Sequence, residues 1–332
     1  MSSRTGIAPA AIRVDHALAD ADTRTLAEDV LDGLTQPFKE LPPKHLYDAR
    51  GAALFEQICG LPEYYPTRTE RAILEQTADQ IVEASGAGEL VELGSGSATK
   101  TRLLLDAMAR AGTLERYVAV DVTENVVRES AVRLTGEYPG LSVHGLIGDF
   151  ERHLDRLPAP QARRLFVFLG GTIGNFRPGS RRRFLRTIGA LLGPDDRLLL
   201  GTDLVKDRAT LEAAYDDAAG VTARFNRNIL RVLNRELDGN FEPEEFDHVA
   251  FFDPLNEWIE MRLRARAAQT VELAAIGLRV EFAAGEEMRT EISAKFTRER
   301  LEADLAAAGL ELAGWYTDER DWFALSLAQA TT

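Results

Sequence analysis

The sequence predicts an α/β fold in which helices cover both faces of a mostly parallel, doubly wound sheet, and a second α+β lobe is attached. From residue 89 to residue 205, short apolar runs alternate with longer amphipathic stretches, as in repeated βαβ units. Residues 310–318 and 321–330 are apolar segments joined by a short polar turn, which predicts that the sheet ends in an antiparallel hairpin. Residues 241–296 contain short alternating strands between polar turns, which indicate an antiparallel lobe.

Helical segments are expected before the sheet begins. Residues 24–34 have a helical apolar period, which the proline pair at 42–43 interrupts because proline cannot continue a helix. A second helix is expected at 52–58. Residues 61–70 place two tyrosines between prolines, which predicts a rigid aromatic wall ahead of a helix at 68–85.

Five parallel strands, with helices between them, are expected in the sheet. Their near-continuous apolar runs are typical of strands covered on both faces. The expected strands are 89–93, 116–122, 141–149, 163–171 and 197–205. The helices between them are expected at 98–112, 123–138 and 178–192. Residues 207–237 also have a helical pattern, and a last helix at 297–308 precedes the hairpin.

These elements divide the chain into five parts. Residues 1–23 are an N-terminal extension to which no function is assigned, and residues 24–85 are a helical segment that contributes to the second lobe. Residues 86–205 form the cofactor-binding core. Residues 206–296 are an insertion that forms the substrate-binding lobe, and residues 297–332 supply the helix and hairpin that complete the core sheet.

The composition is that of an acidic globular protein. Its 332 residues are 45% apolar, enough to bury a core larger than one minimal nucleotide-binding domain. The net charge of -14 and the isoelectric point near 5.0 argue against a nucleic-acid partner, because binding to phosphate backbones depends on clustered Lys and Arg. A small-molecule or cationic substrate fits this charge better.

Cysteine and histidine usage indicates a reduced compartment and no metal centre. Cys59 is the only cysteine, so neither an intramolecular disulfide nor a cysteine-based zinc cluster is possible. The five histidines have no metal-ligand spacing. The N-terminal region lacks the apolar core of a signal peptide, and no stretch approaches the ~20 apolar residues of a membrane-spanning helix. We therefore expect a cytoplasmic monomer with no membrane partner.

The turn after the first core strand has the chemistry of a cofactor site. In VELGSGSATKTR (91–102), the strand leads through Gly94 and Gly96 into a helix, and glycine there allows a ligand to approach the backbone. Taken alone, this G-x-G pattern is also compatible with tight packing and no ligand. Thr99 stands where a dinucleotide fingerprint has its third glycine, which favours a shorter ligand made of adenosine and an amino acid.

Polar and aromatic residues follow the next strands. Asp121 ends the second strand, where a carboxylate can accept hydrogen bonds from both ribose hydroxyls, although a helix N-cap is also possible. Asp149 and Phe150 end the third strand, where they can bind the adenine amino group and stack on the base. The glycine-rich turn at 170–175 allows close approach of a substrate amine, or is a tight turn with Asn175 as a helix cap.

Together with longer strings, these motifs resemble one known family. The strings are LPPKHLYDARGAALFEQI, LPEYYPTRTE, VELGSGSATKTR, FLGGTIGNF, LLLGTDLVKD, AYDDAAGVTARFNRN and FAAGEEMRTEISAKF. Over residues 24–330 the chain is similar to the L-histidine Nα-methyltransferases of ergothioneine biosynthesis. The resemblance implies the class I S-adenosylmethionine-dependent methyltransferase fold, S-adenosyl-L-methionine as the cofactor, and conversion of L-histidine to its trimethylammonium betaine, hercynine.

The resemblance also implies the site residues, position by position. The cofactor-binding positions are Tyr47, Gly94, Lys100, Asp121, Asp149 and Phe150. The positions near the reacting amine, taken as the catalytic set, are Tyr47, Gly170 and Thr172. The positions that contact the imidazole and the substrate carboxylate are Tyr64, Asn175 and Tyr215. The wall that determines substrate specificity consists of Met261, Glu291 and Ser293.

Glu291 and Ser293 suit an imidazole chemically, because one acceptor and one donor-acceptor group can read its two ring nitrogens. The spacing Glu-Ile-Ser places both side chains on the same face of a strand. A buried carboxylate would favour the charged ring by roughly 1.5–3 kcal/mol. Tryptophan, with one ring N–H and more volume, is expected to fit poorly. Without the resemblance, an exposed strand carboxylate remains the simpler interpretation of Glu291.

The reaction expected from the resemblance is in-line attack of the neutral α-amine on the sulfonium methyl group, three times in succession, on L-histidine and its mono- and dimethyl forms. Positioning would contribute roughly 7–11 kcal/mol, so no strong general base is needed, and the proton leaves through water or a nearby tyrosine. Three alternatives stay open: methylation of another aromatic amino acid, an NAD-dependent oxidoreductase, and a noncatalytic sensor of the cofactor.

Overall fold

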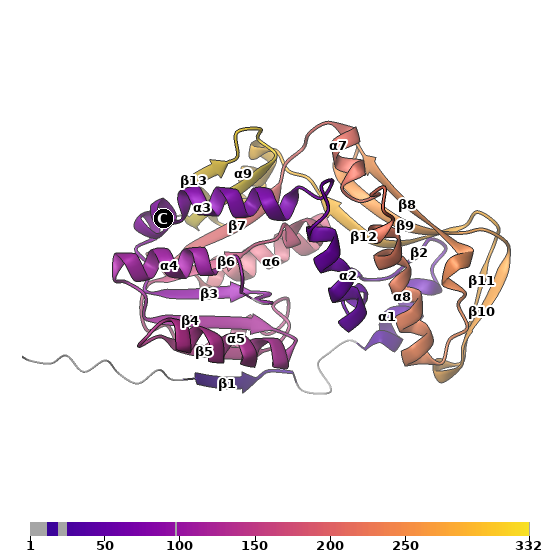
Figure 1. Ribbon diagram of the computed structural model, residues 1–332, viewed down its shortest axis with the longest axis horizontal. Coiled ribbons are helices and arrows are strands. Elements are labelled where there is room, and N and C mark those ends of the chain that lie inside the picture. The colour runs from indigo at the N-terminus through magenta and orange to yellow at the C-terminus, as the bar shows by residue number, and fades with distance from the viewer. Residues whose placement is uncertain (1–11, 19–24, 97, 332) are drawn as a thin grey trace, which may run out of the picture.

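A computed structural model describes residues 12–18, 25–96 and 98–331 of the chain. Its main element is an eight-stranded sheet (Figure 1). In spatial order the strands are β1 (Ile12–His16), β5 (Ser142–Ile147), β4 (Arg116–Asp121), β3 (Glu89–Leu93), β6 (Arg164–Phe168), β7 (Arg197–Asp203), β14 (Phe323–Ala330) and β13 (Leu310–Thr317). β14 runs antiparallel to both of its neighbours, and the other pairs are parallel. This arrangement confirms the predicted α/β fold with a terminal hairpin.

Helices cover both faces of the main sheet. The helices on one face are α3 (Pro66–Ser85), α4 (Arg102–Ala111) and α5 (Glu124–Glu137). Those on the other face are α6 (Pro178–Leu191) and α9 (Arg298–Ala306). Successive residues of β3 point to opposite faces, so Leu90 packs in the first core and Val91 in the second. A strand used on both faces has to be buried throughout, as β3 is.

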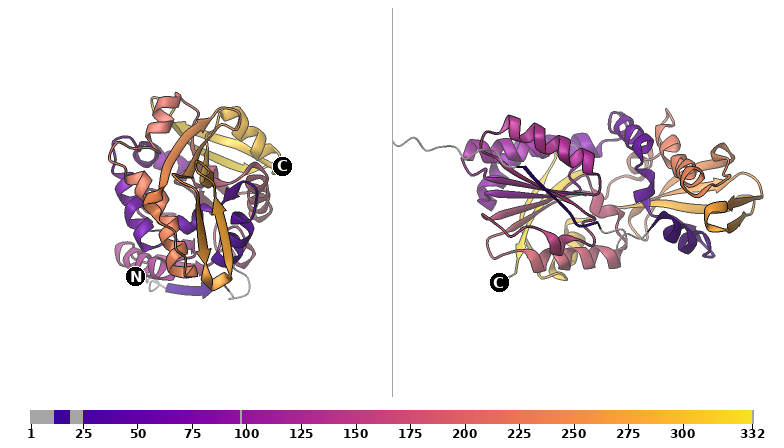
Figure 2. Two further views of the ribbon diagram at one scale, coloured as in Figure 1. Left: turned by 90° about the vertical axis from the view of Figure 1, so that its right-hand side faces the viewer. Right: turned by 90° about the horizontal axis from the view of Figure 1, so that it is seen from below.

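The second lobe is built on a smaller sheet and a separate hairpin. The sheet contains, in order, β2 (Lys39–Glu40), β12 (Glu287–Ala294), β9 (Trp258–Ala265) and β8 (Phe246–Asp253). The hairpin consists of β10 (Gln269–Leu273) and β11 (Leu278–Phe282). These strands share an apolar core with α1 (Leu26–Leu34), α2 (Ala49–Cys59) and α8 (Val221–Leu237). Figures 1 and 2 show the lobe beside the edge of the main sheet toward which β3 and β4 point.

Backbone contacts between β7 and β12 join the two halves. Leu204, directly after β7, forms an isolated bridge with Phe296. The N–H of Phe296 donates to the carbonyl oxygen of Asp203 at 2.8 Å, and the N–H of Val205 donates to the carbonyl oxygen of Phe296 at 2.9 Å. The 3₁₀ turn η3 (Thr172–Asn175), which follows β6, also lies against β12. The ends of β6, β7 and β12 therefore meet at one place.

Three features differ from the expected organisation. β1 pairs in parallel with β5, so residues 12–16 of the expected extension form an edge strand, while residues 1–11 and 19–23 lie outside the described residues. α3 packs mainly on the core sheet, and only its first turn contacts the lobe, where the hydroxyl of Thr67 donates to the sulfur of Cys59. The expected helical stretch 207–237 is divided into α7 (Arg208–Ala213) and α8. Asp217 causes the new start, because its carboxylate accepts the first N–H groups of α8.

Gly174→Ala is expected to disturb the junction between the halves. A Cβ at Gly174 would lie 2.9 Å from the carbonyl oxygen of Ala294 in β12, a backbone atom that cannot turn aside. We expect this overpacking to lower the free energy of unfolding by about 1–3 kcal/mol. In the control Gly136→Ala, an added Cβ in α5 meets nothing within 4 Å, and we expect a gain of about 0.5–1 kcal/mol. Urea unfolding measures both, and equal stabilities would contradict a tight junction.

Candidate active site

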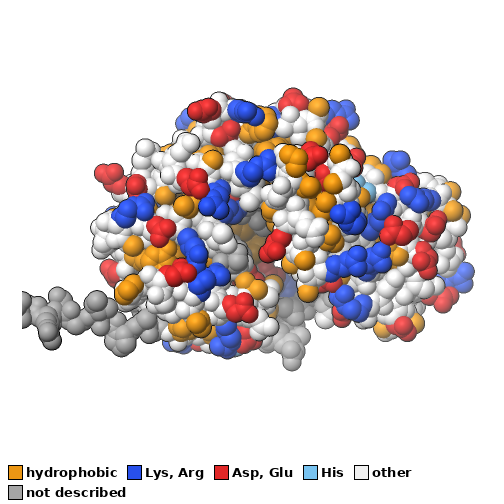
Figure 3. Space-filling view, viewed as in Figure 1, with side chains coloured by type: hydrophobic (Ala, Val, Ile, Leu, Met, Phe, Trp, Pro, Cys, Tyr) orange, Lys and Arg blue, Asp and Glu red, His pale blue; other side chains and the backbone are white. Residues whose placement is uncertain are grey.

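A cavity of about 240 Å³ opens where the core and the lobe meet. Figure 3 shows the molecule hollowed between these two halves. The residues expected to act in catalysis or to bind substrate all border this cavity, together with Lys100, which like Tyr47 belongs to the expected cofactor set. They are Tyr47, Tyr64, Lys100, Gly170, Thr172, Asn175, Tyr215, Met261, Glu291 and Ser293. The structure thus brings together side chains that are up to about 250 positions apart in the sequence.

Residues of the expected cofactor set lie at the carboxyl ends of β3 and β4. Gly94 has a φ of +70°, which glycine adopts without strain, and an added Cβ would lie 3.4 Å from the ring of Phe150. The carboxylate of Asp121 accepts the N–H groups of Gly96 and Thr123, each at 2.9 Å. These bonds fix the glycine-rich turn beside β4 and leave each carboxylate oxygen able to accept a further hydrogen bond. Asp121 therefore supports the helix start and remains able to bind ribose hydroxyls.

Asp149 and Phe150 lie at the end of the neighbouring strand β5. Asp149 Oδ1 accepts the N–H of Glu151 at 2.8 Å, which fixes this turn. The ring of Phe150 packs edge-on against Phe168 of β6, with 5.2 Å between the ring centroids. Phe150 is only half-buried, so part of its aromatic surface is available to a flat ligand.

A buried carboxylate that the sequence analysis did not single out connects two of the glycine-rich turns. Glu70, in α3, is fully buried. Its Oε1 accepts the N–H of Gly170 at 2.7 Å, and its Oε2 forms an ion pair with Lys100. Gly170 and Gly171 both have positive φ, so this turn depends on glycine. Glu70 thereby fixes the turn that follows β6 and holds Lys100 at the cavity wall.

Aromatic rings form one wall of the cavity. The ring of Tyr47 lies 5.3 Å from that of Phe225 and 5.5 Å from that of Phe55, measured between centroids. Phe55 contacts Tyr64 at 6.0 Å, and Tyr64 contacts Tyr215 at 6.2 Å. Phe55 and Phe225 were not among the expected site residues, because their places in apolar helix patterns resemble those of ordinary core residues. Such a wall favours apolar and cationic groups of a ligand.

Glu291 and Ser293 both border the cavity from β12, in agreement with their spacing of two residues. Met261 lies directly opposite Glu291 on β9. Glu291 is 8% exposed, and among the described residues its Oε2 has no hydrogen-bond partner. Burial raises the pKa of Glu291 to about 7, although the charge of Lys295 opposes this shift. A buried carboxylate of this kind requires a donor from a ligand or from water.

The hydroxyl groups of Tyr215 and Ser293 lie 2.8 Å apart at the cavity. Beside them is Lys295, whose Nζ also forms an ion pair with Asp203 at 2.8 Å. Burial works against the charge of Asp203, but Lys295 and Lys206 outweigh it and hold the pKa of Asp203 below its ordinary value. Lys295 was not among the expected site residues, although EISAK continues the two-residue spacing of Glu291 and Ser293.

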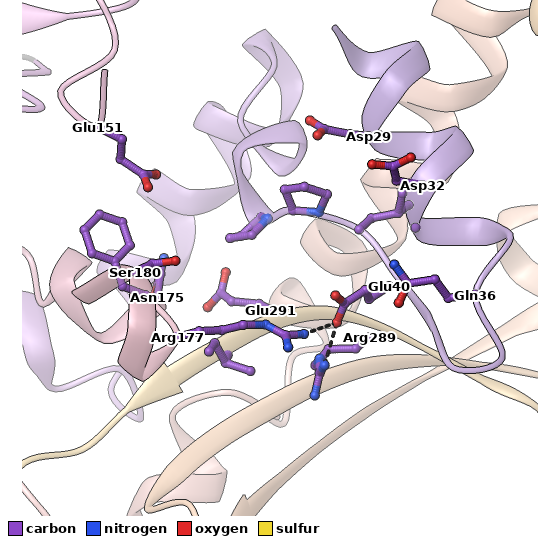
Figure 4. Close-up of a pocket in the computed structure, with 16 residues that line it drawn as sticks. Asp29, Asp32, Gln36, Glu40, Glu151, Asn175, Arg177, Ser180, Arg289 and Glu291 are labelled. Atoms are coloured by element: carbon purple, nitrogen blue, oxygen red, sulfur yellow. Dashed lines mark hydrogen bonds and ion pairs between the residues drawn. The ribbon is translucent and has the colours of Figure 1, made fainter. Parts of the chain in front are cut away.

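A second cavity of about 290 Å³ adjoins the first, and Asn175 and Glu291 border both. Figure 4 shows the Glu291 side chain near the charged groups of this second cavity. Glu40 of β2 forms ion pairs with Arg289 of β12 and with Arg177 of the core. The pair of Glu40 with Arg177 therefore links the lobe to the core beside Glu291.

The described residues give little support for a reactive thiol, a metal centre or a membrane-spanning helix. Burial raises the pKa of the Cys59 thiol, which disfavours the reactive thiolate. In residues 12–18, 25–96 and 98–331, no group of three or more His, Cys, Asp or Glu side chains could hold a metal ion. No helix in these ranges is both long and apolar enough to cross a membrane.

Comparisons with known proteins cover the core, the lobe and the cavity. Residues 26–330 match the family described as "Histidine-specific methyltransferase, SAM-dependent". The chain is 53% identical to Histidine N-alpha-methyltransferase of Mycolicibacterium smegmatis and 50% identical to that of Mycobacterium tuberculosis, over 95% of this chain and 98% of each relative. It is 32% identical to Ergothioneine biosynthesis protein 1 of Neurospora crassa, over 84% of this chain and 32% of that protein.

The contribution of Glu291 to the stability of the ligand-free protein is expected to fall as the pH rises from about 5 to 7. With its pKa raised from 4.5 to about 7, Glu291 keeps its proton longer in the folded state than in the unfolded state. Above pH 7 the folded state must hold a buried charge. We expect the free energy of unfolding of Glu291→Gln to be higher than that of the unaltered protein by on the order of 2 kcal/mol at pH 8. At pH 5 we expect a much smaller difference.

Chemical unfolding of both proteins at the two pH values measures this difference. Glu92, whose pKa burial also raises to about 7, is present in both proteins and cancels in the comparison. A difference in unfolding free energy that is the same at pH 5 and pH 8 would contradict the buried state of Glu291.

Proposed function

Because the chain belongs to the family of histidine-specific, S-adenosylmethionine-dependent methyltransferases, we propose that it transfers three methyl groups in turn to the α-amino nitrogen of L-histidine. The product is then the trimethylammonium betaine hercynine, and the reaction is the first step of ergothioneine biosynthesis. The observation that carries this proposal is the family match over residues 26–330. It is supported by a cavity with aromatic rings on one wall and the buried carboxylate of Glu291 on another.

The imidazole ring is proposed to bind at β12. Glu291 has an oxygen without a partner among the described residues, and Ser293 lies on the same face of the strand. Together they can read the two ring nitrogens, while Met261 limits the volume and Tyr64 packs on the ring. An indole has one N–H and can donate to only one of these two groups, and if Glu291 is left without that donor the cost is roughly 1–3 kcal/mol.

The methyl donor is S-adenosyl-L-methionine, which when bound supplies a methyl group on a positively charged sulfur. We propose that Asp121 holds its ribose and that Asp149 and Phe150 hold its adenine. These residues fit such a ligand, because each Asp121 oxygen can accept a further bond and Phe150 keeps part of its ring exposed. Gly94 lets the backbone approach the ligand, and the proposed set is completed by Tyr47 and Lys100 at the cavity.

The enzyme's main contribution is proposed to be the position of the amine. Asn175 and Tyr215 would hold the substrate carboxylate, which places the amine near the turn that contains Gly170 and Thr172. Such positioning can contribute roughly 7–11 kcal/mol. Burial raises the pKa values of Tyr64 and Tyr215, so both phenols stay protonated and act as hydrogen-bond donors. The amine proton released at each step would therefore leave through water.

The alternatives have less support. An NAD-dependent oxidoreductase or a noncatalytic sensor would share the first glycine-rich turn, but the family is one of methyltransferases. Another aromatic amino acid remains the alternative nearest in chemistry, and Glu291 weighs against it.

We further propose a cytoplasmic monomer without nucleic-acid or membrane partners, because its net charge of -14 disfavours phosphate backbones. Residues 86–205 would bind the cofactor, residues 297–332 complete the core sheet, and residues 206–296 with α1 and α2 would form the substrate-binding lobe.

A reaction with S-adenosylmethionine and an equimolar mixture of the twenty amino acids tests the proposal. Mass spectrometry is expected to show histidine carrying one, two and finally three methyl groups, with the other amino acids unchanged. A different methylated amino acid would keep the cofactor but refute the proposed roles of Met261, Glu291 and Ser293. No methylated product would favour the sensor.

Glu291→Ala is expected to reduce kcat/KM for histidine at least tenfold, since a charge-assisted hydrogen bond is worth roughly 1.5–3 kcal/mol. Glu281→Ala, on the exposed side of β11, is the matched control and should leave kcat/KM within about twofold. Steady-state kinetics with both variants measure the effect. Unchanged kinetics in Glu291→Ala would refute its role in binding the imidazole.

A further inference from the structure

Lys295 is a buried cation to which the proposed reaction assigns no role. It follows β12, and its side chain is fully buried. Its Nζ donates to the hydroxyl oxygens of Tyr215 and Ser293, each at 2.9 Å, and pairs with Asp203 at 2.8 Å. An ammonium group has three hydrogens, so these three acceptors use all of them. Lys295 can therefore influence a ligand only through its charge and through Tyr215 and Ser293.

Lys295 limits how the two hydroxyl groups can arrange their hydrogens. The oxygens of Tyr215 and Ser293 lie 2.8 Å apart, so one of the two hydroxyl hydrogens lies between them. The ammonium group can only donate, so it accepts neither hydrogen. The other hydrogen is left for the cavity that both residues border. The pair thus offers one donor to a ligand, and a carboxylate oxygen is a suitable acceptor.

The charge around Asp203 also favours binding of a carboxylate. Asp203 pairs with Lys295 at 2.8 Å and with Lys206 at 2.6 Å, and the hydroxyl of Tyr65 donates to it at 2.9 Å. Burial lowers the pKa of Lys206 to about 8, so Lys206 is still mostly protonated at pH 7. Among the groups in direct contact with Asp203, two ammonium groups face one carboxylate, and the carboxylate of Asp318 acts on the Lys206 side of this cluster. Water screens the positive charge of the two ammonium groups weakly because they and Asp203 are buried, so it attracts an anion.

We propose that Lys295 is a positioning residue that makes the Tyr215 end of the cavity selective for a carboxylate. It leaves one hydroxyl hydrogen for the ligand, and it supplies positive charge behind that hydrogen. Tyr215 donates to the substrate carboxylate, and Ser293 donates to Tyr215. Ser293 then faces the imidazole as an acceptor, as Glu291 does, and two acceptors match a ring that is protonated on both nitrogens.

This inference rests on the proposed function, and it differs from a merely structural role for Lys295. Lys295 also ties β12 to β7 through Asp203. If this tie were its whole effect, its removal would weaken all substrate-site ligands by similar factors. Selectivity for a carboxylate instead predicts that ligands with and without this group respond differently.

The test compares L-histidine with L-histidinol, which has a hydroxymethyl group in place of the carboxylate. Dissociation constants are measured by calorimetry with S-adenosylhomocysteine present. Lys295→Met is expected to weaken histidine at least about tenfold and histidinol less than about threefold. The control Lys206→Met also removes one positive charge from Asp203 but contacts neither Tyr215 nor Ser293. It is expected to change the ratio of the two constants by less than about threefold.

Equal weakening of both ligands by Lys295→Met, or no weakening, would overturn the proposal. If Lys295→Met and Lys206→Met changed the ratio of the two dissociation constants equally, the proposal that Lys295 orients the hydroxyl hydrogens would be overturned. The effect would then be explained by positive charge without any orientation. Binding of S-adenosylhomocysteine shows that a variant is folded. If Lys295→Met does not fold, Lys295→Gln takes its place with the same expected results. Turnover of histidine by the unaltered protein is measured first. If another amino acid is methylated instead, that amino acid and its amino alcohol become the pair of ligands that is compared. Failure of the proposed substrate is thus distinguished from failure of the proposal for Lys295.

Discussion

The buried ion pair between Asp203 and Lys295 is the interaction on which the junction of the two halves and the cavity depend. Asp203 ends β7 in the core, and Lys295 follows β12 in the lobe. Removing one partner of a buried pair costs roughly 3–5 kcal/mol, yet a well-packed apolar pair is often equally stable. The pair is therefore better explained by the side chains that it positions than by the stability that it contributes. It brings Tyr215 and Ser293 to the end of the core strand where the cavity opens.

The features that the sequence predicted are those set by local periodicity. Alternating apolar runs predicted each parallel strand from β3 to β7, because burial on both faces leaves a plain local pattern. Gly94 and Asp121 were each expected directly after a core strand, and they lie there with their turns hydrogen-bonded through Gly96. Glu291 and Ser293 were expected on one face of a strand, and both border the cavity. The role of each side chain toward a ligand stays a prediction.

The features that the sequence did not predict depend on contacts between distant segments. Glu70 lies on an amphipathic helix, and its contact with Gly170 spans 100 positions of the chain. β1 is a five-residue edge strand, and its Asp15 meets His144 of β5 at 2.9 Å, a partner that no local pattern reveals. Lys295 resembles an exposed strand lysine until β7 brings Asp203 beside it. Buried polar groups of this kind follow from tertiary packing, so composition and periodicity cannot distinguish them from surface charges.

The charged groups at Glu291 and those behind Tyr215 and Ser293 differ in sign, and this difference constrains the ligand. Glu291 offers a buried carboxylate with one oxygen that has no hydrogen-bond partner among the described residues, while Lys295 and Lys206 outweigh the single charge of Asp203. A ligand with a proton-donating ring and a carboxylate satisfies both regions, because the ring donates to Glu291 and the carboxylate accepts the free hydroxyl hydrogen of the Tyr215 and Ser293 pair. The reacting nitrogen gains volume and a permanent positive charge as it is methylated. The aromatic wall around Tyr64 suits that change, because aromatic rings attract alkylated ammonium groups that can no longer donate three hydrogen bonds.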